Sequence, residues 1–244
     1  MSECWPRDSR SGRAGAVLPA WAHALAVIAH PDDESFGLGA VIDGLAAAGA
    51  AVHIMCYTHG GASTLNATHA DLHRARETEL RRAAAELGAA DVTLLDYPDG
   101  GLAGIPAAEL AGHVAEAADR AKASGLLVFD DTGVTGHLDH RAATGAAVLA
   151  GRRAGLPVLA WTLPAAVATA LSAGTGQHFA GQPPDLIDLC VRVSRGQQRR
   201  AALLHASQIS PGAVLWRRLA LLGDREYLRW LVPPAEAITS PAAP

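Results

Sequence analysis

Continuous apolar runs alternate with amphipathic segments through the first two thirds of the chain. The amphipathic segments, at 37–48, 71–87, 107–123 and 141–153, have the periodicity of helices. The apolar runs do not alternate with polar residues, which is typical of strands covered on both faces of a parallel sheet. This order predicts an α/β, Rossmann-like three-layer fold with a mostly parallel sheet, helices on both faces and a smaller irregular C-terminal portion. The runs cover 24–29, 51–57, 92–95, 126–129 and 157–162.

The regular alternation ends near residue 165. Beyond it we expect a loop over 172–184, a strand over 186–193 and helices over 195–205 and 213–222. We predict a flexible leader over 1–20, a catalytic core over 21–165, an extension over 166–232 that completes the domain and the substrate pocket, and a disordered Pro- and Ala-rich tail over 233–244.

Composition and charge indicate which kinds of partner the protein lacks and where in the cell it is located. The net charge is −4 and Lys122 is the only lysine, so the chain lacks the positive surface that nucleic acids and anionic membranes attract. No apolar stretch reaches the roughly 20 residues that span a bilayer, and no secretory signal is evident. These features favour a cytoplasmic protein with no nucleic-acid or membrane partner. The Ala-, Arg- and Gly-rich, Lys-poor usage resembles proteins of high-GC actinobacteria.

The first apolar run ends in the sequence His30-Pro31-Asp32-Asp33-Glu34, called the first motif below. Three acids beside one imidazole repel one another unless a positive charge lies among them. They could also cap the helix that follows, because acids are favoured in a first helical turn. For Glu34 we favour capping or support of the neighbouring ligands.

A second cluster, His137-Leu138-Asp139-His140 (the second motif), follows the fourth apolar run. Ligands of open α/β sheets bind at the carboxyl ends of the strands, so the two motifs should meet at one edge. Imidazoles and a carboxylate suit Zn²⁺, and catalytic zinc keeps three protein ligands and one open position. We predict that His30, Asp33 and His140 are the metal ligands, with Asp32 left beside the metal as a base.

The two motifs resemble the signature motifs of the LmbE/PIG-L family of zinc-dependent N-acetylglucosaminyl de-N-acetylases. Arg76-x-x-Glu79-Leu80, Tyr97-Pro98-Asp99-Gly100 and His205-Ala-Ser-Gln208 are also similar to members. The resemblance implies the same three ligands, Asp32 as general base, and His137 as the group that stabilises the oxyanion and helps to protonate the leaving amine. It further implies that Asp139 supports the site and that Arg76 and Asp99 contact the sugar.

The activity implied by the resemblance is metal-dependent hydrolysis of an N-acetyl or related N-acyl group on an amino-sugar-containing small molecule. Zinc is the expected cofactor, with Fe(II) as an alternative, and family members can form homo-oligomers. Thiol-conjugate amidase activity, tailoring of a natural product in secondary metabolism, and a non-catalytic metal-binding role stay open. Two departures bear on mechanism: Leu138 replaces the proline of the usual HPDH motif, and Thr135 replaces a tyrosine that some members carry.

Two unrelated classes of protein are disfavoured. Gly37-Leu38-Gly39 opens a helix after a strand, as in nucleotide-binding folds, but the preceding acids would repel a pyrophosphate and no GxxxxGK[ST] sequence occurs. A phosphotransfer receiver would need a lysine at a strand end, whereas Lys122 lies inside a helical pattern.

Overall fold

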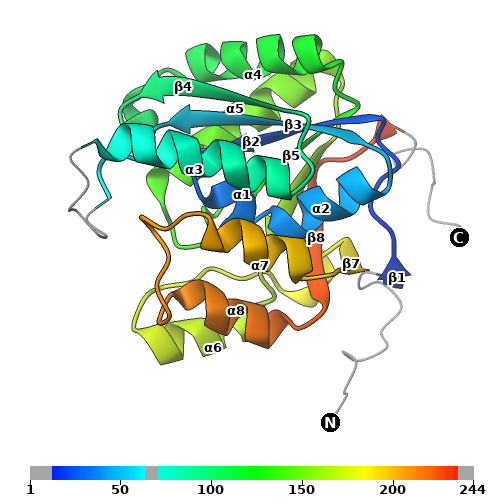
Figure 1. Cartoon of the computed structure of the whole chain (residues 1–244). Coiled ribbons are helices and arrows are strands. Elements are labelled where there is room, and N and C mark those ends of the chain that lie inside the picture. The colour runs from blue at the N-terminus through cyan, green and yellow to red at the C-terminus, as the bar shows by residue number, and fades with distance from the viewer. Residues whose placement is uncertain (1–12, 64–70, 236–244) are drawn as a thin grey trace, which may run out of the picture.

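The computed structural model describes residues 13–63 and 71–235. Within them an eight-stranded sheet runs in the order β1-β7-β8-β6-β5-β2-β3-β4 (Figure 1). The predicted α/β fold is confirmed, and the five strands predicted from apolar runs form within two residues of their expected ends. The strands are β1 (Arg13–Ala16), β2 (His23–Ile28), β3 (Ala51–Thr58), β4 (Asp91–Tyr97), β5 (Gly125–Phe129), β6 (Val158–Thr162), β7 (Leu189–Arg192) and β8 (Arg225–Val232).

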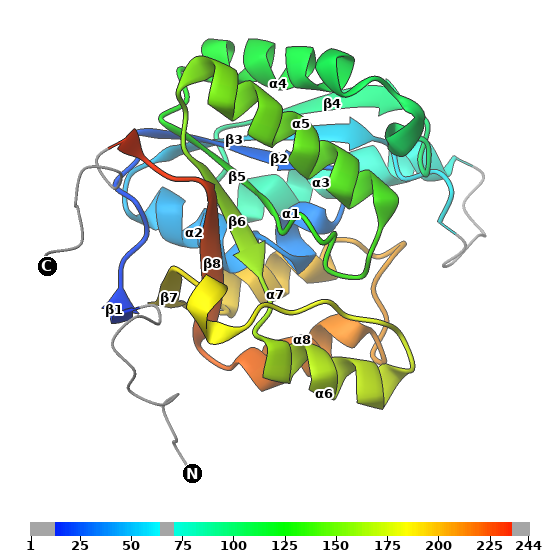
Figure 2. The ribbon, with the colours of Figure 1, turned by 180° about the vertical axis from the view of Figure 1, so that it is seen from behind.

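Helices cover both faces of the sheet, because its central strands are apolar on both sides. One hydrophobic cluster joins the sheet to α2 and α3 through residues such as Leu45 and Leu80. The other joins the opposite face to α4 and α5 through residues such as Val114 and Ala147 (Figure 2). The α-helices are α1 (Asp33–Phe36), α2 (Gly39–Ala47), α3 (Leu72–Glu86), α4 (Ala107–Ala121), α5 (Leu138–Ala154), α6 (Ala165–Thr175), α7 (Gly196–Leu203) and α8 (Val214–Leu222).

The C-terminal part differs most from the sequence-based expectation. Strand β8, which was not predicted, runs antiparallel between β6 and β7, and so joins this part to the central sheet. Helix α6 occupies the first residues of the expected loop over 172–184. Within the expected leader, Arg13–Ala16 form β1 and pair with β7; residues 1–12 and 236–244, including most of the expected tail, lie outside the described residues.

The carboxyl ends of β2, β3, β4 and β5 open on one edge of the sheet, and their connections carry the polar residues of both motifs. Helix α1 begins directly after β2, and α5 begins after the loop that follows β5. None of the helices among the described residues is long and apolar enough to cross a membrane.

Candidate metal centre and active site

Asp33 links the two motifs. Its Oδ2 accepts hydrogen bonds from the backbone N–H groups of Ala29 (3.1 Å) and His30 (3.0 Å), which closes the turn between β2 and α1. Its Oδ1 lies 3.1 Å from Nε2 of His140, more than a hundred residues further along the chain. Burial raises the pKa of this carboxyl, but the charge and hydrogen bond of His140 and the neighbouring His30 outweigh it and lower the pKa well below its usual range.

The second motif lies at the beginning of α5. The helix begins at Leu138, three residues earlier than the periodicity predicts, so His140 lies in its first turn rather than in a loop. The reason is a cap: His137 is the N-cap, and its Nδ1 accepts a hydrogen bond from the backbone N–H of Asp139 (3.2 Å). Nδ1 of His140 lies 3.3 Å from the carbonyl of Gly133, a contact that leaves Nε2 pointing at Asp33.

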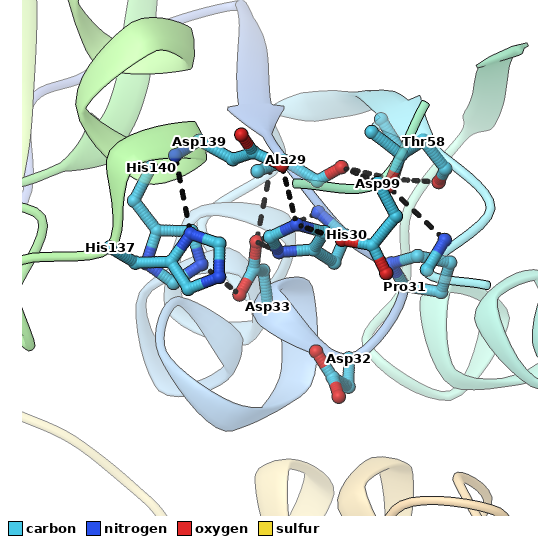
Figure 3. Close-up of polar contacts among 12 residues, drawn as sticks. Ala29, His30, Pro31, Asp32, Asp33, Thr58, Asp99, His137, Asp139 and His140 are labelled. Atoms are coloured by element: carbon cyan, nitrogen blue, oxygen red, sulfur yellow. Dashed lines mark hydrogen bonds and ion pairs between the residues drawn. The ribbon is translucent and has the colours of Figure 1, made fainter. Parts of the chain in front are cut away.

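Three imidazoles gather where the motifs meet (Figure 3). The ring centroids of His30 and His137, and of His137 and His140, lie 4.8 Å apart, and those of His30 and His140 lie 5.3 Å apart. A ligand nitrogen from each of the three lies within 4.8 Å of the others. Imidazole nitrogens with a carboxylate at contact distance are a donor set that suits zinc or ferrous iron. The residues present therefore fit the metal that the motifs imply.

His30 also contacts two carboxylates on its other side. Its Nε2 lies 3.0 Å from Oδ1 of Asp99 and 3.2 Å from Oδ2 of Asp139. Burial lowers the pKa of His30, but the hydrogen bonds to Asp139 and Asp99 and the charge of Asp33 raise it to about 10. A histidine ligand has to be neutral, so a metal ion bound at His30 would compete with a proton for the ring.

Asp139 is held from the opposite side of the site. Its side chain is fully buried and accepts the backbone N–H groups of Gly100 at Oδ2 (2.7 Å) and Leu102 at Oδ1 (3.1 Å). Burial raises its pKa, but the hydrogen bonds from His30 and Gly100 lower it below the ordinary value. Asp139 therefore orients His30 through a carboxylate–imidazole contact, the arrangement that commonly fixes metal-binding histidines.

Asp32 stands apart from the three imidazoles (Figure 3). Its backbone has φ 111° and ψ −25°, a conformation that non-glycine residues rarely adopt. Its Oδ2 lies 3.0 Å from Nη2 of Arg76. Burial raises the pKa of Asp32 to about 6. The positive charge of Arg76 opposes this shift, and the negative charge of Asp33 adds to it. A partly buried carboxylate with a raised pKa is the kind of group that serves as a general base.

The structure divides the predicted site residues into two neighbouring groups. The first is a polar network of six residues on both sides of His30, and the second is the Asp32–Arg76 pair at the start of α1. Two buried residues with no predicted catalytic role, Glu34 and His205, form a further pair that reaches Asp32. The only sequence signal for His205 was the His205-Ala-Ser-Gln208 stretch. The network consists of His30, Asp33, Asp99, His137, Asp139 and His140.

The fold is an α/β fold with a mostly parallel sheet. The site lies at the carboxyl ends of the strands, and its histidines and carboxylates are of the types that bind metal ions. Residues 25–150 match the model of the PIG-L family, described as GlcNAc-PI de-N-acetylase. The chain belongs to this family. It is 33% identical to the 1D-myo-inositol 2-acetamido-2-deoxy-alpha-D-glucopyranoside deacetylase of Nakamurella multipartita, over 91% of this chain and 94% of that protein.

Solved structures share the fold. The N,N′-diacetylchitobiose deacetylase from Pyrococcus horikoshii superposes with a TM-score of 0.65 at 20% identity, over 88% of this chain and 84% of that one. The zinc-inhibited form of teicoplanin deacetylase Orf2 gives a TM-score of 0.64 at 20% identity, over 85% and 97%. At this identity the likeness establishes the architecture, and the chemistry has to be argued from the site itself.

Proposed function

We propose that this protein is a metal-dependent deacetylase that hydrolyses the N-acetyl group of a GlcNAc-containing small molecule. The observation that carries the proposal is the 3.1 Å contact between Asp33 of the first motif and His140 of the second, with Asp32 beside it. Asp33 thereby contacts His140 and lies 3.8 Å from Nδ1 of His30, while the carboxylate of Asp32 is held separately by Arg76. The sugar class rests on family membership and on the Nakamurella relative.

His30, Asp33 and His140 would hold the metal. When bound, such an ion polarises the amide carbonyl and acidifies a water molecule. Asp32 takes the proton of the attacking water, and it then holds a proton for the nitrogen of the leaving amine. Because Arg76 contacts only one of the carboxylate oxygens of Asp32, the other oxygen is left for the water.

His137 would stabilise the oxyanion. Its Nδ1 accepts a hydrogen bond from the backbone of Asp139, so in the neutral ring the proton resides on Nε2. The side chain is exposed at the edge of the site, and Nε2–H would donate to the oxyanion as it forms. Removing one such donor typically lowers kcat by about 10²- to 10³-fold. Because neutral imidazole is a weak acid, we assign the proton for the amine chiefly to Asp32 rather than to His137.

Three features stay at the level of prediction: a cytoplasmic location, zinc rather than ferrous iron, and assembly into a homo-oligomer. Asp99 and Arg76 were expected to bind the sugar. Both are engaged with protein groups, Asp99 with His30 and the backbone N–H of Ala62, and Arg76 with Asp32. We therefore propose that they shape the site chiefly by positioning other residues.

The test is acetate release from the GlcNAc-inositol compound and from N,N′-diacetylchitobiose by zinc-loaded protein. We expect turnover of at least one compound, and a fall in kcat of about 10²- to 10⁴-fold in Asp32→Asn with the metal content unchanged. No acetate from any GlcNAc compound with fully loaded protein would contradict the proposed function. Full activity in Asp32→Asn would instead exclude Asp32 as the base.

A further inference from the structure

A buried ion pair joins the C-terminal part of the chain to the first motif. His205 lies in the turn between α7 and α8, and its Nε2 is 2.6 Å from Oε1 of Glu34 in α1. The two residues are separated by 171 positions, and both side chains are fully buried. A buried carboxylate needs a partner of this kind, because leaving it unpaired costs several kcal/mol.

The second oxygen of the same carboxylate contacts the backbone of Asp32. The N–H of Asp32 donates to Oε2 of Glu34 at 2.9 Å. Glu34 therefore connects His205 to the residue that the proposed function makes the base. Its role goes beyond that of a charge in the first helical turn, since each of its oxygens has a specific partner.

Asp32 needs such support because its backbone is strained. Its φ of 111° is well outside the usual region for an aspartate, and conformations of this kind persist only where the surroundings enforce them. Glu34 holds the N–H of Asp32, and Arg76 holds its carboxylate. Loss of the Glu34 contact would let the peptide rotate and move the carboxylate.

His205 is itself rigidly placed. The ring of Phe36 packs edge-on against it, with centroids 5.8 Å apart. The backbone N–H and the hydroxyl of Ser207 donate to Glu79 of α3 at 2.9 and 2.6 Å. The turn is thus fixed to α3 independently of Glu34, so the His205–Glu34 contact is not required to hold the turn in place.

We infer that His205 is a positioning residue: acting through Glu34, it holds Asp32 in the conformation that deprotonates water. The inference rests on the proposed role of Asp32. His205, in the His205-Ala-Ser-Gln208 stretch, is neither a proposed metal ligand nor a proposed substrate contact. The inference gives this buried residue a function. The C-terminal part of the chain thereby contributes to the reacting site.

Two amide substitutions separate this role from a purely structural one. In His205→Gln the amide nitrogen reaches the place of Nε2 and can still donate to Glu34, whereas in His205→Asn it reaches only the place of Nδ1. We expect kcat of His205→Asn to fall by about 10- to 100-fold with KM within about threefold of native. His205→Gln should recover kcat to within about threefold of native. Glu34→Gln, which keeps the shape but offers one acceptor oxygen instead of two, should resemble His205→Asn.

Ser207→Ala is the matched control, because it loosens the same turn at Glu79 and leaves Glu34 untouched. It should lower the melting temperature while kcat stays within about twofold of native. Metal content, measured in every variant, should stay unchanged. Equal kcat values in His205→Asn and His205→Gln, or an equal loss in Ser207→Ala, would overturn the inference.

Crystal structures of native protein and His205→Asn distinguish failure of this inference from failure of the proposed function. We expect the carboxylate of Asp32 to leave Arg76 and its φ to become negative in the variant. If that shift occurs but native protein releases no acetate from any GlcNAc compound, the positioning contact stands and the proposed function fails. An unmoved Asp32 would overturn the inference whatever the activity.

Discussion

The guanidinium of Arg76 and the carboxylate of Asp32 lie 3.0 Å apart, although 44 residues separate them in the sequence. Arg76 belongs to α3, is almost fully buried, and also donates to the carbonyls of Pro31 and Gly60. Gly60 is required there, since a Cβ at this position would lie 2.0 Å from Nη1 of Arg76. One planar cation thus joins the residues after β2 and β3 and holds the proposed base.

Arg76→Lys should therefore impair catalysis more than binding. Lysine keeps the charge but lacks the planar fork that reaches several acceptors at once. We expect kcat to fall by about 10- to 100-fold with KM changed by less than about threefold. Arg74→Lys, on the exposed face of the same helix, is the control and should behave as native. A rise in KM with kcat preserved would instead assign Arg76 to the sugar.

Leu138→Pro should be neutral or stabilising. Leu138 is the first residue of α5 and is 58% exposed, and proline is favoured at this helical position. The preceding His137 has φ −60° and ψ 123°, which a following proline accepts. Thermal or urea unfolding should show a gain of about 0–1 kcal/mol, with kcat unchanged. A loss of more than about 1 kcal/mol would mean that the leucine side chain contributes packing.

Stability should depend on the pair formed by Asp130 and Arg229. Asp130 is buried after β5 and lies 2.7 Å from Nε of Arg229 in β8. Burial raises the pKa of Asp130, but the hydrogen bonds from Arg229 and Thr132 outweigh it and lower the pKa below its usual value. The carboxylate therefore adds stability above the unfolded pKa of about 4, and this is lost as the pH falls through the lower folded value.

Asp130→Asn should lower the free energy of unfolding by about 2 kcal/mol at pH 7. The difference from native should shrink as the pH falls below about 4. Urea unfolding at pH 3 and pH 7 measures both quantities. Asp131→Asn is the control: it also removes a carboxylate that contacts Arg229, but an exposed one, so it should change stability by less than about 1 kcal/mol. A destabilisation of Asp130→Asn that is the same at both pH values would contradict this account.

The sequence was most informative where buried strands are continuous and apolar. The order of these strands along the chain was enough to predict that both motifs lie at one edge of the sheet. Strand β8 was not predicted because Arg225, Glu226 and Arg229 interrupt its apolar residues. Glu226 is nonetheless buried there, since Arg195 and Nε1 of Trp161 (2.7 Å) contact its carboxylate. Helix α6 was not predicted because its many alanines give it little hydrophobic periodicity, and few of its residues are buried.

The candidate site was predictable in membership but not in its connections. The prediction that His30, Asp33 and His140 lie close together followed from two motifs at the carboxyl ends of strands of one sheet. The sequence could not show that Arg76 lies against Asp32, or that His205 reaches Glu34 across 171 residues. Such contacts depend on the packing of α3 and of the turn after α7, which no local pattern encodes.

The measurement that tests the central claim most directly is the metal content of native protein, His140→Ala and His178→Ala after purification without chelator. His178 is an exposed histidine that belongs to neither motif, and so serves as the control. Inductively coupled plasma mass spectrometry should find about one zinc or iron ion per chain in native protein and in His178→Ala. In His140→Ala the content should fall by about tenfold or more. No metal in native protein even after zinc is added, or equal metal in native protein and His140→Ala, would contradict the claim that the two motifs form one metal centre.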